Sequence, residues 1–194
     1  FRSTEASTNA EARLALDPDE RLYWRYRTRR LEAEVIRDSM LSISGLLDAT
    51  QFGPGTLDGA SRRRSVYFTV KRSKLMPMMQ VFDAPDALSS IGERPTTTIA
   101  PQALLLMNNA QTRSCARSLA GRLPAGGDLS AAIRGAYAFA VARPPSAEEL
   151  ADGAAFIEAQ KASYKSAGAA DPGTAALEDF CQVLMCLNEF VYVE

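Results

Sequence analysis

Apolar positions recur at helical spacing along most of the chain. The clearest case is residues 28–45, "TRRLEAEVIRDSMLSISG", where Thr28 can cap the start of a helix and Gly45 suits its end. The apolar side of this predicted helix comprises Leu31, Val35, Ser39 or Met40, Ile43, and Leu46 or Leu47. We expect this side to face the core.

Prolines and capping residues mark the other helices. Short helices are predicted from Pro18, capped by Asp17, and from Pro77, because proline is accepted in the first helical turn. The later helices are predicted to begin at Pro101, after Asn109, after Asp128, after Ser146 and near Thr174. Ser146 and Glu149 form a capping box.

The helix from Pro101 carries the run Leu104 to Met107 and is apolar all round. Such a pattern is typical of a buried helix, so we expect it to be central. Asn108 and Asn109 can end it and cap the following helix.

One segment has strand character. In "SVYFTVK", residues 65–71, Val66, Phe68 and Val70 alternate with polar positions, which predicts a short strand or an extended segment with one buried side. Because a lone strand leaves its backbone unpaired, we expect it to meet the terminal "FVYVE" or another domain.

These patterns predict a mainly α fold, an irregular multi-helix bundle with long loops and at most one short pair of strands. Residues 1–16 are expected to form a loose lead-in. Residues 17–194 then form one helical domain, in which 17–122 and 128–194 pack together.

Composition fits a soluble globular domain. The chain has 194 residues, of which 46% are hydrophobic and 23% are charged, and a chain of this length buries roughly 70% of its unfolded surface. Because no run of about 18 apolar residues occurs, no membrane span is predicted. The polar start predicts no signal peptide within these residues, so the signal of an exported parent would lie upstream.

The sequence has no histidine and three cysteines. This excludes Ser-His-Asp and Cys-His catalysis and zinc sites that need histidine. Cys181 and Cys186 are about 140° apart on a helix and cannot bond. We interpret the cysteines as buried free thiols, and a bond from Cys115 to either of the others stays open.

Six motifs occur in a set order: "RRLEAEVIRDSML", "RSVYFTVKR", "FDAPD", "TTTIAPQALLLMNN", "ARPPSAEEL" and "NEFVYVE". Together they resemble the C-terminal domain of unknown function of large planctomycete and verrucomicrobial proteins, over roughly residues 17–194. The resemblance implies an exported, periplasmic or extracellular parent with a second uncharacterised domain upstream, and often a cytochrome-c-like domain. This chain has no Cys-x-x-Cys-His, so haem is absent from it, and no cofactor is expected.

A polar loop is the first place where a site is expected. Asp83 and Asp86, with Arg94 nearby, can form Asx turns, hold Ca²⁺, or act as a glycosidase pair. The candidate binding residues as a whole are Asp83, Asp86, Arg94, Thr97, Gln102, Asn108, Trp24 and Arg30. No catalytic or metal-binding set is assigned.

The charge distribution points to an interaction surface. Residues 1–143 carry 20 basic and 14 acidic side chains, whereas residues 144–194 carry 2 and 9. Arginines mixed with Trp24 and tyrosines can bind nucleic acid, but a pI of about 5.7 argues against a dedicated binder. The same residue types, with the methionines of "LMPMMQVF", are enriched in protein interfaces.

We therefore expect a non-catalytic docking domain that contacts the neighbouring upstream domain of its own polypeptide. The alternatives are a glycan-binding or glycan-processing domain that uses the loop carboxylates, and a nucleic-acid binder.

Overall fold

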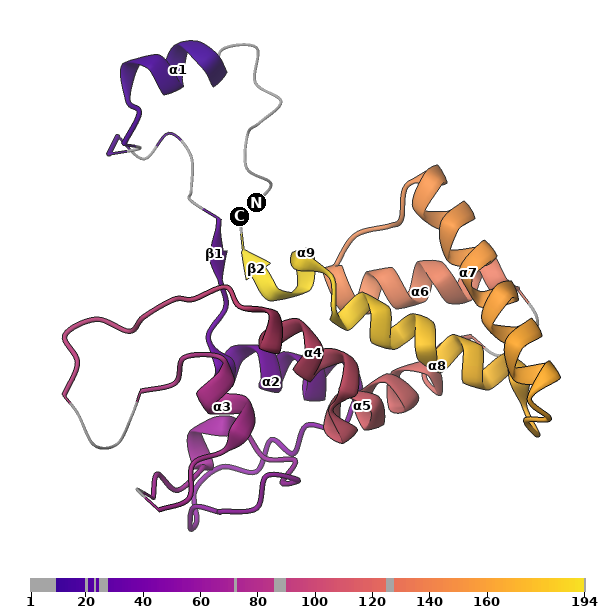
Figure 1. Cartoon of the computed structure of the whole chain (residues 1–194), viewed down its shortest axis with the longest axis horizontal. Helices are drawn as coiled ribbons and strands as arrows, with labels where there is room; N and C mark the ends of the chain where they lie inside the picture. Colours follow the sequence, from indigo (N-terminus) through magenta and orange to yellow (C-terminus); the bar gives the residue numbers. More distant parts are fainter. Residues whose placement is uncertain are drawn as a thin grey trace.

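The computed structural model describes residues 10–19, 21–22, 24, 28–71, 73–85, 90–124 and 128–193. These residues form a mainly α structure, as predicted, with one two-stranded sheet (Figure 1). The helices are α1 (Ala10–Leu16), α2 (Ala33–Ile43), α3 (Pro77–Val81), α4 (Ala100–Asn108), α5 (Ala110–Ala120), α6 (Leu129–Val141), α7 (Ala147–Ser166), α8 (Pro172–Met185) and α9 (Asn188–Val191). The shorter elements are the 3₁₀ helix η1 (Ser65–Tyr67) and the strands β1 (Arg29–Arg30) and β2 (Tyr192–Val193).

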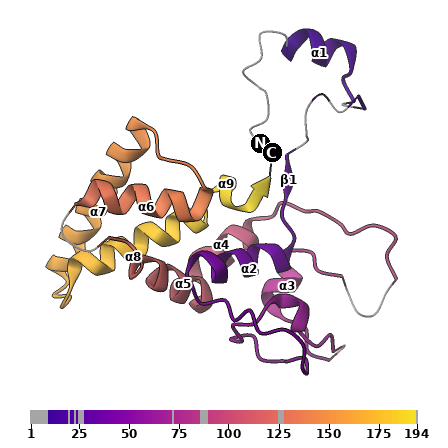
Figure 2. The same ribbon diagram turned by 180° about the vertical axis from the view of Figure 1, so that it is seen from behind.

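The core is built around α8, which packs against α5, α6 and α7 (Figure 2). The Phe180 ring of α8 lies against Tyr137 of α6 and Phe156 of α7, with centroid distances of 6.4 and 6.3 Å. Gly153 lets α7 approach closely, since a Cβ there would lie 3.1 Å from the Phe180 ring.

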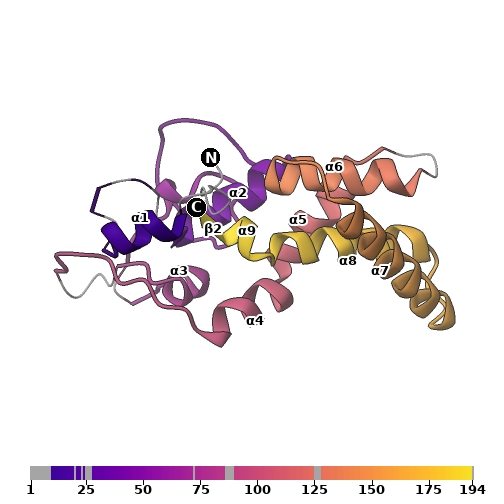
Figure 3. The same ribbon diagram turned by 90° about the horizontal axis from the view of Figure 1, so that it is seen from above.

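The helix α2 connects this core to the N-terminal half of the chain. It packs against α5, α3 and η1 through Ile36, Met40 and Leu41, all of them buried. Seen from above, α6, α7 and α8 gather at one end of the molecule and α3 lies toward the other (Figure 3).

The prediction for α2 was wrong in its start and in its buried side. The helix begins at Ala33, not at a Thr28 cap, because Arg29 and Arg30 are extended in β1. Val35 is 42% exposed, whereas Arg37 is buried. A charged residue on the buried side cannot be recognised from apolar spacing. The predicted stop at Gly45 is confirmed by its positive φ of 74°.

The strand predicted at residues 65–71 is not formed. Residues Ser65–Tyr67 form η1, and Val66 and Val70 are 71% and 73% exposed. The chain end does pair, but with a different segment, since β2 runs antiparallel to β1 in the register Arg29↔Val193 and Arg30↔Tyr192.

The prediction of a helix from Pro18 is wrong, since the described residues after Pro18 form turns. A helix, α1, lies before it within residues 1–16. The Asp17 carboxylate accepts hydrogen bonds from the backbone of Arg21 and Leu22 at 2.9 and 2.7 Å, which closes this turn. In Figures 1 and 2, α1 stands apart from the helical body.

The helix α4 is not central. Gln102 and Leu106 are buried, but Leu104 and Met107 are 56% and 60% exposed. Its apolar run therefore covers both a buried side and a solvent-facing side. The predicted capping role of Asn109 is confirmed, because its side chain accepts from Gln111 N at 2.7 Å at the start of α5.

The other predicted helix boundaries agree with the structure. A helix starts at Pro77, Asp128 caps α6, and Ser146 with Glu149 forms the capping box of α7. The last predicted helix is divided into α8 and α9 by a break after Met185.

The three cysteines are free thiols, with Cys115 and Cys181 buried and Cys186 half-buried. Burial raises the pKa of Cys181 to about 12. Among the described residues, no helix combines the length and apolar character needed to cross a membrane.

Candidate functional site

Five of the eight candidate residues meet around the carboxylate of Asp83. Asp83 follows α3, with a φ of 59°. Its Oδ2 accepts from Arg30 Nη2 at 2.7 Å and from Thr97 N at 2.8 Å. The Thr97 hydroxyl donates to the same carboxylate at 2.8–2.9 Å. We call Arg30, Asp83, Arg94, Thr97 and Gln102 the Asp83 cluster.

Arg30 is the buried cation of this cluster. Its side chain is 3% exposed and lies 5.3 Å from the centre of the Phe82 ring. Beyond the ion pair, Arg30 Nε donates to the Thr97 carbonyl and Nη1 to the Leu31 carbonyl, both at 3.1 Å. The guanidinium therefore joins β1, the residues after α3 and the loop before α4.

The other two members extend these connections. Gln102 donates to the carbonyls of Val81 and Thr97 at 3.0 and 3.2 Å. Arg94 Nε donates to the Asp83 carbonyl at 2.9 Å, and its Nη2 reaches Glu34 of α2 at 2.8 Å.

The electrostatics of the cluster keep Asp83 ionised. Burial alone raises the pKa of this carboxyl, but the hydrogen bonds from Thr97 and the charge of Arg30 outweigh burial and lower the pKa. The carboxylate already accepts from three donor groups of these two residues. Such an arrangement is suited to holding three chain segments together, and it leaves little capacity to bind a ligand.

The remaining candidates lie elsewhere. Asp86 falls outside the described residues. Asn108 donates to the Leu104 carbonyl of its own helix at 2.8 Å, and Trp24 lies in the segment before β1. Within the described part of the chain, no group of three or more acidic or cysteine side chains is placed to hold a metal ion.

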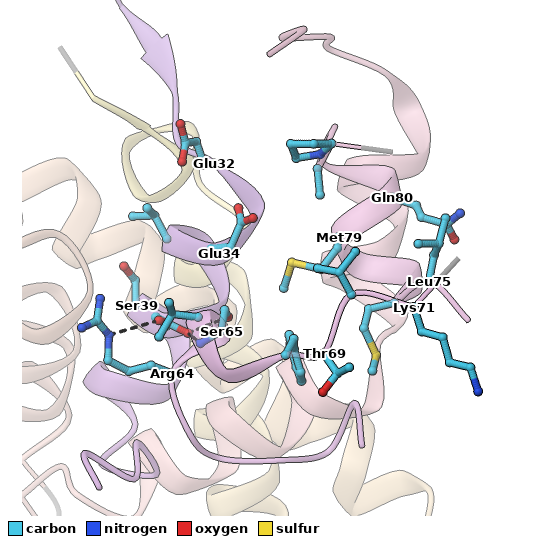
Figure 4. Close-up of a pocket in the computed structure, with 18 of the residues that line it drawn as sticks. Glu32, Glu34, Ser39, Arg64, Ser65, Thr69, Lys71, Leu75, Met79 and Gln80 are labelled. Atoms are coloured by element: carbon cyan, nitrogen blue, oxygen red, sulfur yellow. Dashed lines mark hydrogen bonds and ion pairs between the residues drawn. The ribbon is translucent and has the colours of Figure 1, made fainter. Parts of the chain in front are cut away.

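A groove of about 1060 Å³ lies beside this cluster, between α2 and α3 (Figure 4). Its base is the extended segment that follows η1, and Met79 points from α3 toward α2. The apolar lining consists of Val35, Leu47, Val66, Phe68, Val70, Leu75, Met76, Met79, Ala84 and Pro85. We call this space the α2–α3 groove.

The two walls of the groove differ in charge. Glu32, Glu34 and Asp38 line it at the start of α2 and along that helix. Figure 4 shows Lys71 across the groove from Glu32 and Glu34. Lys74 also lines the groove, and both lysines are exposed. Arg94 partly neutralises the acidic wall, being paired with Glu34 at 2.8 Å and Glu32 at 3.4 Å. Arg64 lies 3.6 Å from Asp38.

The base of the groove is held by Arg37 of α2, whose side chain is 1% exposed. Its guanidinium donates to the carbonyls of Ser61 and Arg63 and to the Ser65 hydroxyl, and it stacks over the Phe68 ring at 4.5 Å. The buried Arg37 therefore fixes the positions of Ser65 and Phe68. Phe68 also forms an isolated parallel bridge with Thr56.

Sequence reasoning found the polar cluster but missed the groove. The methionines of "LMPMMQVF" were recognised as interface or core residues, and the structure divides them, with Met78 in the core and Met76 and Met79 in the groove. The exposed Val66 and Val70 were assigned to the core by the strand pattern.

The sequence profile of one known family matches this chain over residues 2–157. The chain belongs to the PSD1 family, proteins of unknown function (DUF1553). No curated protein and no solved structure matches the chain.

The PSD1 match begins and ends earlier than the resemblance drawn from the motifs. It contains the whole α2–α3 groove and the whole Asp83 cluster, and it ends within α7. The helix α8 lies beyond it, although α8 supplies much of the core. It is joined to the PSD1 part by Arg113 of α5, which pairs with Glu178 at 3.1 Å and with Asp179.

Proposed function

We propose that this PSD1 domain is a non-catalytic docking domain, and that the α2–α3 groove receives a segment of a neighbouring domain in the same polypeptide. One observation carries the proposal. The groove has an apolar base with exposed valines, arginine-paired carboxylates on the α2 side, and the exposed Lys71 and Lys74 in its lining. Exposed apolar surface with a polar rim is typical of protein contact sites.

The charge of the walls defines the partner. A segment that fits would carry a row of apolar side chains and an acidic residue toward Lys71 and Lys74. The carboxylates of Glu34 and Asp38 are already paired with arginines of this chain. Complementary charge fixes the orientation of such a segment and speeds its association more than it raises affinity. Methionine side chains at the contact adapt readily to an apolar partner.

The N-terminal arm supports the same interpretation. Leu16 of α1 and Leu22 after it are 80% and 68% exposed, and α1 stands apart from the helical body (Figure 1). Apolar residues that are exposed on this described segment are consistent with burial against another domain.

The resemblance drawn from the motifs extends the proposal to location. An exported parent would place this domain in the periplasm or outside the cell, next to an upstream domain. Expression of the parent gene with a reporter that is active only after export, fused after Glu194, tests this point, and a fusion that is expressed but inactive would contradict it.

The docking proposal is tested by measuring binding between this chain and the separately expressed N-terminal part of its parent polypeptide. Val70→Glu and Met79→Glu place a charge on the apolar lining and should weaken binding at least about tenfold, or about 1.4 kcal/mol. Phe52→Glu is the matched control, because Phe52 is 81% exposed and outside the groove. Absence of binding, or equal binding by all three variants, would refute the proposal.

The glycan and nucleic-acid alternatives receive no support from these contacts. The Asp83 carboxylate is committed to Arg30 and Thr97. Several basic side chains are likewise bound within the chain, with Arg37 buried and Arg63 donating to the Pro54 carbonyl at 3.0 Å. Ca²⁺ binding at the Asp83 loop would have to include Asp86, and a calcium titration of the wild-type chain would reveal it.

A further inference from the structure

The outer side of α4 is a second apolar surface, outside the α2–α3 groove. Leu104 and Met107 are 56% and 60% exposed, and Ile99, just before the helix, is 45% exposed. Pro101 and Ala103 are exposed on the same helix. Residues three and four positions apart lie on one side of a helix, so these side chains form a continuous strip. We call it the α4 face.

The polar side chains of α4 and the carbonyls at its end bond within the chain. Gln102 is buried and bonds inward, and Asn108 folds back to donate to the Leu104 carbonyl at 2.8 Å. At the C-terminal end, Gln182 of α8 donates to the carbonyls of Leu106 and Met107 at 3.2 and 2.7 Å. The α4 face can therefore lose its water without leaving these groups unpaired.

The α4 face is also free of charge. No charged residue occurs from position 95 to position 112, a stretch of 18 residues, whereas the 23% charged share of the chain would place about four there. Charged residues are depleted at the centres of protein interfaces. Helices that lie on membrane surfaces carry lysine or arginine on their polar side, and α4 has neither.

An uncharged apolar strip is complementary to itself. In a twofold dimer the same patch meets its own copy, so a charged residue near the axis would face a like charge. A heterologous partner, by contrast, is usually selected by complementary charge, which the α4 face does not offer and the groove does.

We propose that the α4 face is a self-association surface, through which two copies of this chain pair with their α4 helices packed against each other. Leu104 and Met107 are its central residues, and Ile99 and Pro101 extend it toward the helix start. This interface uses none of the residues that line the groove, so its existence is independent of the docking proposal.

The test is the molar mass of the whole chain in solution between about 1 and 100 μM, measured by sedimentation. The wild type should pass from monomer toward dimer over this range. The double variant Leu104→Glu/Met107→Glu should remain monomeric with an unchanged thermal midpoint, since both positions are solvent-facing. Val70→Glu, at a 73% exposed apolar position in the groove, should dimerise like the wild type.

A charge-exchange experiment tests the twofold arrangement itself. Leu104→Lys/Met107→Lys should also be monomeric alone, but a mixture of the lysine and glutamate variants should form a mixed dimer. A wild-type chain that stays monomeric at the highest concentration would overturn the proposal. A dimer that survives the glutamate pair, or one that Val70→Glu abolishes, would do the same, because it would use another surface. Failure of the mixed dimer would refute the face-to-face pairing of α4.

Discussion

Replacing Asp83 by alanine separates a structural role from a binding role at the polar cluster. The change removes a carboxylate that accepts from Arg30 at 2.7 Å and from the backbone and hydroxyl of Thr97 at 2.8–2.9 Å. It leaves the Arg30 guanidinium, whose side chain is 3% exposed, without its counter-ion. Alanine also tolerates the positive φ of 59° less well than aspartate does.

The magnitude follows from these contacts. Removing one member of a buried ion pair costs about 3–5 kcal/mol. We expect the lower end, about 3 kcal/mol, because Asp83 is 14% exposed and Arg30 keeps its bonds to the Thr97 and Leu31 carbonyls. For a chain of this length, about 2–4 °C is lost per kcal/mol, so the thermal midpoint should fall by about 6–12 °C.

Thermal and urea unfolding, followed by circular dichroism, measure this effect. Asp83→Asn keeps the tolerance for positive φ and one hydrogen-bond acceptor, so its thermal midpoint should fall about half as far as that of Asp83→Ala. Asp58→Ala is the control, since Asp58 is exposed and its carboxylate accepts from the nearby Ala60 N at 2.9 Å. If Asp83→Ala left the midpoint unchanged while abolishing binding of a glycan or Ca²⁺, the structural interpretation would be refuted.

Three further predictions concern the C-terminal half. Hydrogen bonds from Arg143 and from Ser146 lower the pKa of Glu149 from 4.5 to about 2. Because this pKa is lower in the folded state than in the unfolded state, the ionised carboxylate stabilises the fold above about pH 4.5. This stabilisation is lost as the pH falls toward 2. Arg143→Met should therefore cost about 1 kcal/mol in urea unfolding at pH 7 and little near pH 2, and an equal cost at both would contradict this linkage. All three thiols should react with a thiol reagent in denaturant without reductant, whereas Cys181 should resist it in the native chain at pH 8; a single reactive thiol would instead reveal a disulfide. Gly153→Ala should lower stability by about 1 kcal/mol, since a Cβ 3.1 Å from the buried Phe180 ring outweighs the gain in helix propensity, and a higher thermal midpoint would show that the ring gives way freely.

The helices could be predicted because their ends carry local signals. The Asn109, Asp128 and Ser146 caps depend only on residues two or three positions away, and each is formed as predicted. The buried side of α2 depends on a distant loop instead. Arg37 is buried because its guanidinium donates hydrogen bonds to the carbonyls of residues 61 and 63, and no pattern within the helix reveals these partners.

The same limit explains the errors around the groove and α4. The alternation of Val66, Phe68 and Val70 is a valid strand signal, but Arg37 and Asp38 hold Ser65 in a turn and leave the valines exposed. Leu104 and Met107 led to the prediction of a buried helix. An apolar run does not reveal whether both sides of the helix pack within the same chain or one side is left for another chain. The convergence on Asp83 could be anticipated, since Arg94, Thr97 and Gln102 are close in sequence. Its main partner, Arg30, comes from 53 positions away.

The most direct test of the docking account is the rate at which peroxide oxidises individual methionines in the isolated chain and in its full parent polypeptide. Met76 and Met79 line the groove, whereas Met107 is 60% exposed outside it. With both proteins dilute enough to be monomeric, the account predicts that oxidation of Met76 and Met79 slows several-fold in the parent while that of Met107 is unchanged. Equal rates for Met76 and Met79 in the two proteins would mean that the groove is empty in the parent, and the account would be wrong.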